Sequence, residues 1–249
     1  MPHHLLINPN TSTATTARLE QALRPQLPQD VQLTVRTAAF GARYIACEAS
    51  HAVAGAAVLQ TWAEHLAQAR GDAAMPLDGV LIGCFGDPGL FALRESSACA
   101  VTGLAEASFI EAARLGPFAV VTGGERWKPM LQRLALALGF GEALRHVETV
   151  APTGAQMQAD PALALRHLRE ACRAAARPGV RSLIVGGAGL AGYAQALQDG
   201  VDLPLIDSVQ AGLKVLLEGR APAPQRSADG FVADWSAVTP QMARLSAAT

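Results

Sequence analysis

One cysteine stands where a short apolar run gives way to a turn rich in glycine and proline. The run is Val80–Ile82, and the turn extends from Gly83 to Leu90 with Cys84 near its start. Asp87 is a residue type that caps helices and Pro88 suits a first helical position, so we expect a helix to begin here. Backbone N–H groups at a helix start favour a thiolate, which predicts a lowered pKa for Cys84. Cys84 is therefore a candidate acid/base or nucleophile.

The alternative interpretation is that Cys84 is a small buried hydrophobic residue, as many intracellular cysteines are. The other three cysteines, Cys47, Cys99 and Cys172, lie before a predicted helix, at a strand start and inside a helix, and we interpret them as packing or surface thiols. The sequence has no CxxC pair and no Cys/His cluster at zinc spacing. We expect reduced thiols, no disulfide framework and no metal site.

The composition favours a globular protein that acts on a small molecule. Of 249 residues half are apolar, and 20 basic against 21 acidic side chains give a net charge of -1. That balance does not supply the basic surface that nucleic acid requires. No apolar run approaches the length of a membrane span, and the start of the chain does not resemble a secretory leader, so we expect no membrane partner and a cytoplasmic location.

Short apolar runs alternate with alanine-rich helical segments, which predicts an α/β fold with parallel sheet. In such folds the functional groups follow the carboxyl ends of the strands. The predicted strands are 4–7, 31–35, 79–82, 100–104, 118–121, 183–185 and 203–206, and the predicted helices include 48–70, 127–138, 161–176, 208–218 and a last one near 239–247.

A weak internal repeat relates the two halves of the chain. The strand and turn at 5–12 resemble those at 119–125, 81–86 resembles 183–189, and 100–103 resembles 204–207. We therefore expect two similar domains, one formed by residues 1–115 with 219–249 and the other by 116–218. Turns after matched strands would line one interdomain cleft, where ligand sites are common.

Polar residues and free N–H groups after these strands are candidates for holding a substrate and stabilising an enolate. Because the side chains among them are uncharged, they suit a neutral ring imide. The alternative for the first group is a turn followed by a helix cap. The candidates are Asn8, Asn10, Thr11, Ser12, Thr122, and the backbone around Phe85, Gly86, Ala188 and Gly189.

A set of motifs extends over nearly the whole chain: Ile7-Asn8-Pro9-Asn10-Thr11-Ser12, Tyr44-Ile45, the Cys84 turn, Gly103-Leu104-Ala105-Glu106-Ala107, Val121-Thr122, Glu125-Arg126-Trp127 and Ala188-Gly189-Leu190-Ala191-Gly192. In these motifs the chain resembles the hydantoin/allantoin racemases of the cofactor-independent aspartate/glutamate racemase superfamily. The resemblance implies two pseudo-symmetric flavodoxin-like domains, an active site between them, no cofactor and a homo-oligomer. It also implies one cysteine per domain, which remove and replace a proton on opposite faces of a carbon next to a carbonyl.

The sequence departs from that pattern at Gly187, where the family's second cysteine would fall. With Cys84 alone, inversion should be slow, whereas proton delivery to one face or attack on a double bond stays feasible. Arylmalonate decarboxylases, of the same superfamily, work with one cysteine in the second half, so the arrangement here would be mirrored. The alternatives are a single-cysteine lyase, decarboxylase or isomerase, or an ordinary racemase in which Gly187 is an engineered or degenerate substitution.

Two further classes of function are alternatives. Gly187–Gly192 fits G-x-G-x-x-G after a strand, with Asp207 about 20 residues on, as in dinucleotide-binding oxidoreductases. A non-catalytic ligand-binding protein is the other, and its Cys84 would not react selectively with iodoacetamide. His51 and Trp127 are interpreted as packing residues.

Overall fold

The computed structural model describes residues 1–69, 76–151, 160–224, 233 and 235–246, and its core is two parallel four-stranded sheets. In the first sheet the order is β2-β1-β3-β4, and every neighbouring pair is parallel. In the second the order is β6-β5-β7-β8, again all parallel. The strands are β1 His3–Asn8, β2 Gln32–Thr37, β3 Gly79–Ile82, β4 Ala100–Gly103, β5 Phe118–Gly123, β6 Leu144–Val150, β7 Ser182–Gly186 and β8 Leu205–Asp207.

The two sheets share one strand order, and the pairs matched in the sequence, β1 with β5, β3 with β7 and β4 with β8, hold equivalent places. The two-domain α/β fold with parallel sheets is thus confirmed. The sequence analysis missed β6, the equivalent of β2. Its residues, Leu-Arg-His-Val-Glu-Thr-Val, place charged side chains on a half-covered edge strand, so the continuous apolar run typical of the central strands is absent.

Most predicted helices begin within a residue of their expected positions, whereas the one after Cys84 begins later than predicted. Of the predicted helix ends, Arg70 and Ala247 lie outside the described residues. The helices are α1 Thr13–Leu23, α2 Glu48–Ala69, α3 Leu90–Ser96, α4 Leu104–Ala113, α5 Trp127–Ala137, α7 Pro161–Ala175, α8 Tyr193–Leu197, α9 Ser208–Leu217 and α10 Pro240–Ala243, with 3-10 turns η1 Arg24–Gln26, η2 Ala188–Leu190, η3 Gln198–Gly200 and η4 Arg244–Ser246.

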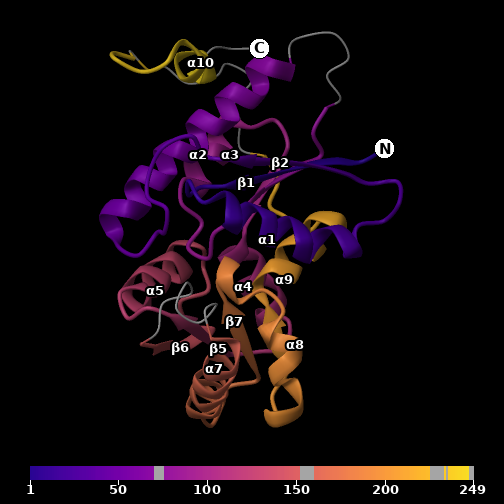
Figure 1. Cartoon of the computed structure of the whole chain (residues 1–249), viewed down its shortest axis with the longest axis vertical. Coiled ribbons are helices and arrows are strands. Elements are labelled where there is room, and N and C mark those ends of the chain that lie inside the picture. The colour runs from indigo at the N-terminus through magenta and orange to yellow at the C-terminus, as the bar shows by residue number, and fades with distance from the viewer. Residues whose placement is uncertain (70–75, 152–159, 225–232, 234, 247–249) are drawn as a thin grey trace.

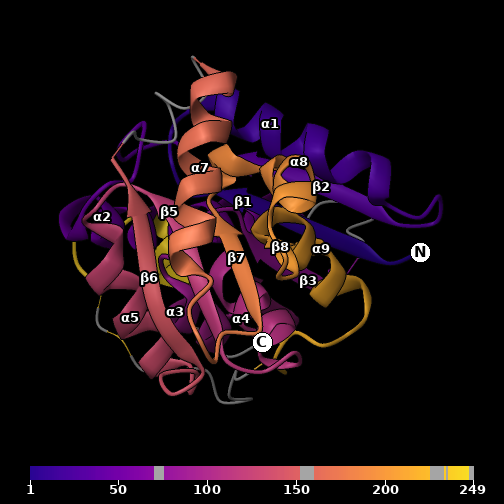
Figure 2. The same cartoon turned by 90° about the horizontal axis from the view of Figure 1, so that it is seen from below.

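A single apolar core joins the facing sides of the two sheets. It contains Leu6 and Leu81 from the first sheet and Val120 and Ile184 from the second, together with side chains of α1, α4, α5 and α9. Alternate residues of the same strands point away from it, because successive side chains of a strand face opposite sides. They pack under α2 and α3 in the first half and under α7 and α8 in the second. Figure 1 shows α1, α4 and α9 between the two sheets, and Figure 2 shows α7 over the second sheet.

Helices α4 and α9 cross between the halves. They pack against each other, and while α4 follows β4 it contacts β7 and β8 of the other sheet. In the same way α9 follows β8 but contacts β3 and β4. The last helix, α10, returns to the first half and packs on α2 (Figure 1). The domain boundaries at 115/116 and 218/219 stay a prediction, since these helices belong to both halves by contact.

Among the residues that the model describes, no helix is both long enough and apolar enough to cross a membrane.

Candidate active site

The turn after β3 differs from the sequence prediction. Asp87 and Pro88 do not begin a helix, because the chain first makes tight turns in which the N–H groups of Gly86 and Asp87 donate to the Cys84 carbonyl. Asp87 has a φ of 50° and Gly89 a φ of 77°, and α3 begins only at Leu90. Cys84 therefore does not lie at the start of a helix.

The expected depression of the Cys84 pKa is wrong. Cys84 is only 8% exposed, and burial raises the pKa of its thiol because a thiolate is poorly solvated there. The neighbouring Asp87 carboxylate raises that pKa further. In the resting protein Cys84 is a neutral thiol at pH 7, which can donate a proton before it can accept one.

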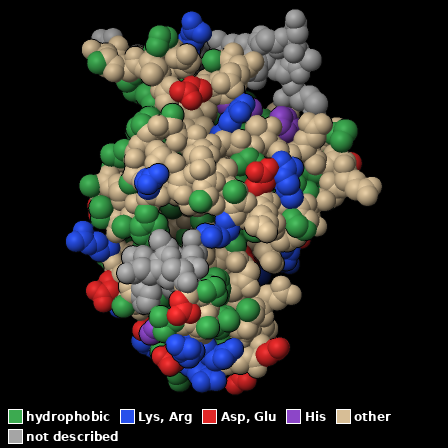
Figure 3. Space-filling model, viewed as in Figure 1, with side chains coloured by type: hydrophobic (Ala, Val, Ile, Leu, Met, Phe, Trp, Pro, Cys, Tyr) green, Lys and Arg blue, Asp and Glu red, His purple; other side chains and the backbone are tan. Residues whose placement is uncertain are grey.

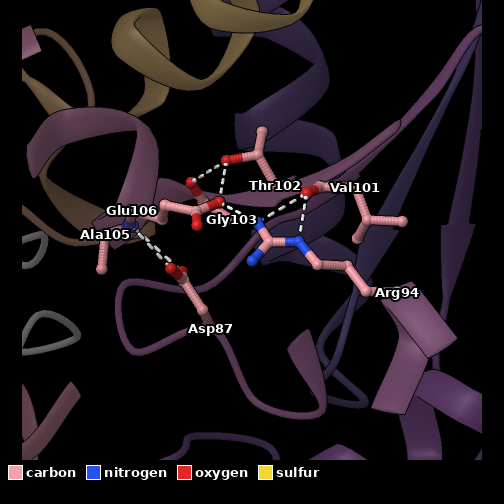
Figure 4. A network of polar contacts seen from close by, with 7 residues as sticks. All are labelled: Asp87, Arg94, Val101, Thr102, Gly103, Ala105 and Glu106. Atoms are coloured by element: carbon pink, nitrogen blue, oxygen red, sulfur yellow. Dashed lines mark hydrogen bonds and ion pairs between the residues drawn. The ribbon is translucent and has the colours of Figure 1, made fainter. Parts of the chain in front are cut away.

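Asp87 is fixed by the next helix rather than by α3. Its two carboxylate oxygens accept from the N–H groups of Ala105, at 3.0 Å, and Glu106, at 2.7 Å, at the start of α4 (Figure 4). Burial raises the Asp87 pKa to about 7, and the Glu106 carboxylate acts in the same direction, although these N–H donors oppose the shift. Gly103 makes this approach possible, because a Cβ there would overlap with the Asp87 side chain. The turn that carries Cys84 is thereby tied to α4.

We predict that Asp87→Asn lowers the Cys84 pKa. The substitution removes the negative charge that disfavours a thiolate and keeps the side-chain volume. Iodoacetamide should then alkylate Cys84 faster than in the wild type at any pH above about 7, where Asp87 is ionised. Mass spectrometry of the alkylated peptide measures the rate. An unchanged profile of rate against pH would contradict a charge effect of Asp87 on this thiol.

Cys84 opens into a cavity with a volume of about 170 Å³ that residues of both halves line. From the first half come two stretches after β1 and β2 and the turn after β3. The second half supplies the loop after β7, Thr122 near the end of β5 and Trp127 at the start of α5. The lining is Asn10, Ser12, Ala14, Thr15, Arg18, Arg43, Tyr44, Ile45, Gly83, Cys84, Phe85, Thr122, Trp127, Gly187, Ala188, Gly189 and Leu190.

Two aromatic side chains cross between the halves beside this cavity. The Phe85 ring lies on Gly186 and the Trp127 ring lies on Gly86, so closely that a Cβ at either glycine would overlap with the ring. His51 stabilises the second contact, since its Nε2 is 2.8 Å from the Gly86 carbonyl oxygen and its ring meets Trp127 edge-on. These contacts fix the two walls of the cavity relative to each other.

Of the polar candidates after β1, only Asn10 and Ser12 line the cavity. The Asn10 Oδ1 accepts from the Ser12 N–H at 2.9 Å, which leaves its Nδ2 without a partner among the described residues. Ser12 also caps α1, as the alternative interpretation expected. Asn8 is fully buried and donates to the Asn10 Oδ1 and to the Ser12 carbonyl, so it supports the loop from behind. Thr11 is likewise absent from the lining.

The candidates of the second half differ in what they can offer a ligand. The Thr122 hydroxyl donates to the Gly186 carbonyl at 2.7 Å, so only its lone pairs face other partners. The Gly187 N–H donates to the Ser208 Oγ at 3.1 Å. The N–H of Ala188 has no partner within the described part of the chain, and the same holds for the N–H of Phe85. Gly86 is absent from the lining, and its N–H is bonded to the Cys84 carbonyl.

Asp207 cannot have the role that the dinucleotide-binding alternative requires of it. Asp207 caps α9 by accepting from the N–H groups of Val209 and Gln210, and its other oxygen accepts from the Gly192 N–H at 2.6 Å. Its carboxylate is therefore occupied by the backbone rather than free to bind a ribose. Within the described ranges there is also no group of three or more His, Cys, Asp or Glu side chains that could hold a metal ion.

The sequence analysis missed the charged part of the lining. Arg18 lies on α1 and Arg43 in the segment between β2 and α2, and both line the cavity that contains Cys84. Tyr44 beside Arg43 marked the family resemblance without being assigned a role. No motif predicts the two arginines, because they reach Cys84 only through the packing of α1 and of the segment after β2.

A larger cavity, of about 730 Å³, lies along α9 and β8 and contains neither Cys84 nor Gly187. Its Glu111 pairs with Lys214 at 2.7 Å and with Arg220. Because the charged side chains there pair with one another, we take the smaller cavity, which contains the thiol, as the candidate active site.

A model of the Asp/Glu/Hydantoin racemase family matches residues 5–216. The chain belongs to this family. A hydantoin racemase of a Pseudomonas species is 30% identical over 211 residues, which are 84% of this chain and 82% of that protein. Among solved structures, allantoin racemase from Klebsiella pneumoniae superposes with a TM-score of 0.83 at 28% identity, covering 98% of this chain and 99% of the other.

The fold is shared with a solved structure that is more distant in sequence. A double mutant of arylmalonate decarboxylase, 17% identical, superposes with a TM-score of 0.63 over 90% of this chain and 95% of the other. At that identity the likeness concerns the two flavodoxin-like domains alone. The racemase fold therefore places the cavity between two similar halves, and its residues decide the chemistry.

Proposed function

We propose that the protein is a cofactor-independent acid/base enzyme that acts on a carbon next to a carbonyl, on hydantoin-like or allantoin-like compounds, with Cys84 as its one catalytic thiol. The observation that carries the proposal is that Cys84 and Gly187, from equivalent turns of the two halves, line one cavity. Family membership and the hydantoin and allantoin racemases among its relatives support the substrate class.

Proton transfer at such a carbon passes through an enolate, whose oxygen needs hydrogen-bond donors. The unpartnered N–H groups of Phe85 and Ala188 and the Nδ2 of Asn10 are suitable donors in this lining. Cys84 exchanges the proton on one face. Gly187 offers no acid/base group on the other face, so hydrogen exchange at this carbon should be much faster than inversion of its configuration.

Solvent deuterium exchange tests the proposal. In D2O, one enantiomer of a 5-substituted hydantoin should gain deuterium at C5, followed by NMR, while chiral chromatography shows slower loss of optical purity. Because the Cys84 pKa is raised, abstraction needs the scarce thiolate, and the exchange rate should increase with pH above 7. Absence of exchange with several hydantoins and with allantoin would contradict the proposed function.

A second candidate is a decarboxylase, favoured by the neutral state of Cys84 and by the single thiol. The bond between the substrate carbon and its carboxylate would break, CO2 would leave, and the electron pair would form the enolate. Cys84 would then give its proton to the carbon and recover one from solvent. Release of CO2 from substituted malonates, with one product enantiomer in excess, would favour this candidate over the first.

We predict that Gly187→Cys raises the racemisation rate by at least about tenfold, because a second acid/base then faces the substrate. A Cβ at 187 has room, since its closest neighbour would be the Leu190 Cγ at 3.5 Å. The φ of 142° is unfavourable for any residue with a Cβ, and should cost about 1–3 kcal/mol of stability. Gly187→Ala is the matched control, with the same strain and no thiol. Equal racemisation by the two folded variants would contradict the two-face geometry.

A cytoplasmic location and a homo-oligomeric state stay predictions.

A further inference from the structure

The charged groups that line the candidate active site are all basic. Arg18 and Arg43 belong to the lining, and no aspartate or glutamate does, as far as the structure describes the chain. The Asp87 carboxylate is close enough to Cys84 to raise the pKa of its thiol, but it does not line the cavity, and its two oxygens are held by backbone donors. A ligand in this cavity therefore meets positive charge that no side chain of the lining neutralises.

Neither guanidinium is paired with a side chain that the structure describes. Six arginines elsewhere form ion pairs with glutamates, at positions 24, 94, 114, 133, 177 and 220. By contrast, the described residues provide Arg18 and Arg43 with no ion pair and no hydrogen-bond partner. Basic and acidic side chains are interspersed on the face drawn in Figure 3, whereas the charged side chains in the lining of this cavity are basic.

The two arginines come from elements that the fold holds in place. Arg18 is half-buried on α1, which contacts η2 of the opposite wall. The segment that carries Arg43 is fixed on both sides, because the Ala42 carbonyl accepts from the Thr11 N–H at 3.1 Å and Ile45 is buried in the core. The backbone at both positions is thus fixed, while the exposed Arg43 side chain would still lose conformational freedom on binding a ligand.

We propose that the substrate of Cys84 carries a carboxylate, which Arg18 and Arg43 bind. This inference rests on the proposed function and narrows its substrate class from a neutral ring to an anionic one. A guanidinium donates to both oxygens of a carboxylate in one plane, which a neutral amide cannot match in charge. The carboxylate would hold the substrate at the arginine end of the cavity and leave the acidic carbon to Cys84.

Two probes that differ only in charge test the inference: hydantoin-5-acetate and hydantoin-5-acetamide. Isothermal titration calorimetry should find the acetate bound more tightly by the wild type, by at least about tenfold. In the double variant Arg18→Gln/Arg43→Gln, the ratio of the two dissociation constants should fall to about one. Arg145→Gln is the matched control, since Arg145 is exposed on β6 outside the cavity and its loss should leave the preference intact.

Equal binding of the two probes by the wild type, or no binding of either, would overturn the inference, and so would a preference that survives in the double variant. Deuterium exchange at C5 is measured separately on the same compounds. Preferred binding of the acetate without exchange supports the carboxylate site and counts against the proposed reaction. Exchange on both compounds with equal affinity supports the reaction and overturns the carboxylate site.

Discussion

Replacement of Cys84 by alanine should reduce turnover by a factor of at least about 10², because a positioned acid/base group typically contributes 10²–10⁴-fold. The fold should persist, since the side chain is small and the turn around it is held by backbone hydrogen bonds and by Asp87. Deuterium incorporation or CO2 release, whichever reaction the wild type performs, measures the loss. Circular dichroism checks the fold.

Cys172→Ala is the matched control. Cys172 is buried, as Cys84 is, but it lies on the core-facing side of α7 and does not line the cavity. The variant should lose some stability and keep its turnover. If Cys84→Ala keeps more than a tenth of the wild-type rate while remaining folded, another group performs the proton transfer.

The second large effect concerns the ion pair between Arg94 and Glu106, which lies under the active-site turn. Both side chains are 4% exposed, Arg94 also donates to the Val101 carbonyl at 2.9 Å, and Glu106 accepts from the Thr102 hydroxyl at 2.8 Å (Figure 4). Arg94→Met would leave the Glu106 carboxylate buried without a counter-charge. We expect a loss of about 3–5 kcal/mol in the free energy of unfolding, measured by urea denaturation.

Two comparisons separate this effect from lost packing. Arg94→Met/Glu106→Gln removes both charges and should recover much of the loss, because the neutral amide at position 106 no longer requires a counter-ion. Arg133→Met breaks the exposed pair with Glu48 and should cost at most about 1 kcal/mol. If the single Arg94 variant is as stable as the double variant, the buried charge is not the cause.

Strands buried on both faces are predicted most accurately, and the less buried edge strands β2 and β8 are predicted with bounds one or two residues from the observed ones. Gly79–Ile82 is a continuous apolar run whose bounds match the prediction to the residue, because burial on both faces leaves no place for a polar side chain. Edge strand β6 is missed, since Arg145, His146 and Glu148 interrupt the apolar run by which the central strands are recognised. The internal repeat could have located it by symmetry with β2.

For the site, the sequence locates the groups that follow strands but not their environment. Cys84 and Gly187 do line one cavity, as the motifs predicted. The direction of the thiol pKa was wrong, because local capping rules do not register that Asp87 turns away to α4 and that the thiol is buried. Arg18 and Arg43 could not be predicted either. In the sequence, an arginine on a helix surface or in a loop looks the same whether it lines a cavity or is only solvated.

Helices α4 and α9 lie between the two sheets and contact both, so the two similar halves share one core, as the subunits of a symmetric dimer share an interface. Each sheet is covered in part by a helix that follows the other sheet, so neither half should unfold alone, and a single cooperative transition is expected. A true dimer of identical subunits must change both walls of its cleft at once. Fusion into one polypeptide removes that constraint, so one wall can keep its thiol while the equivalent position of the other wall is a glycine.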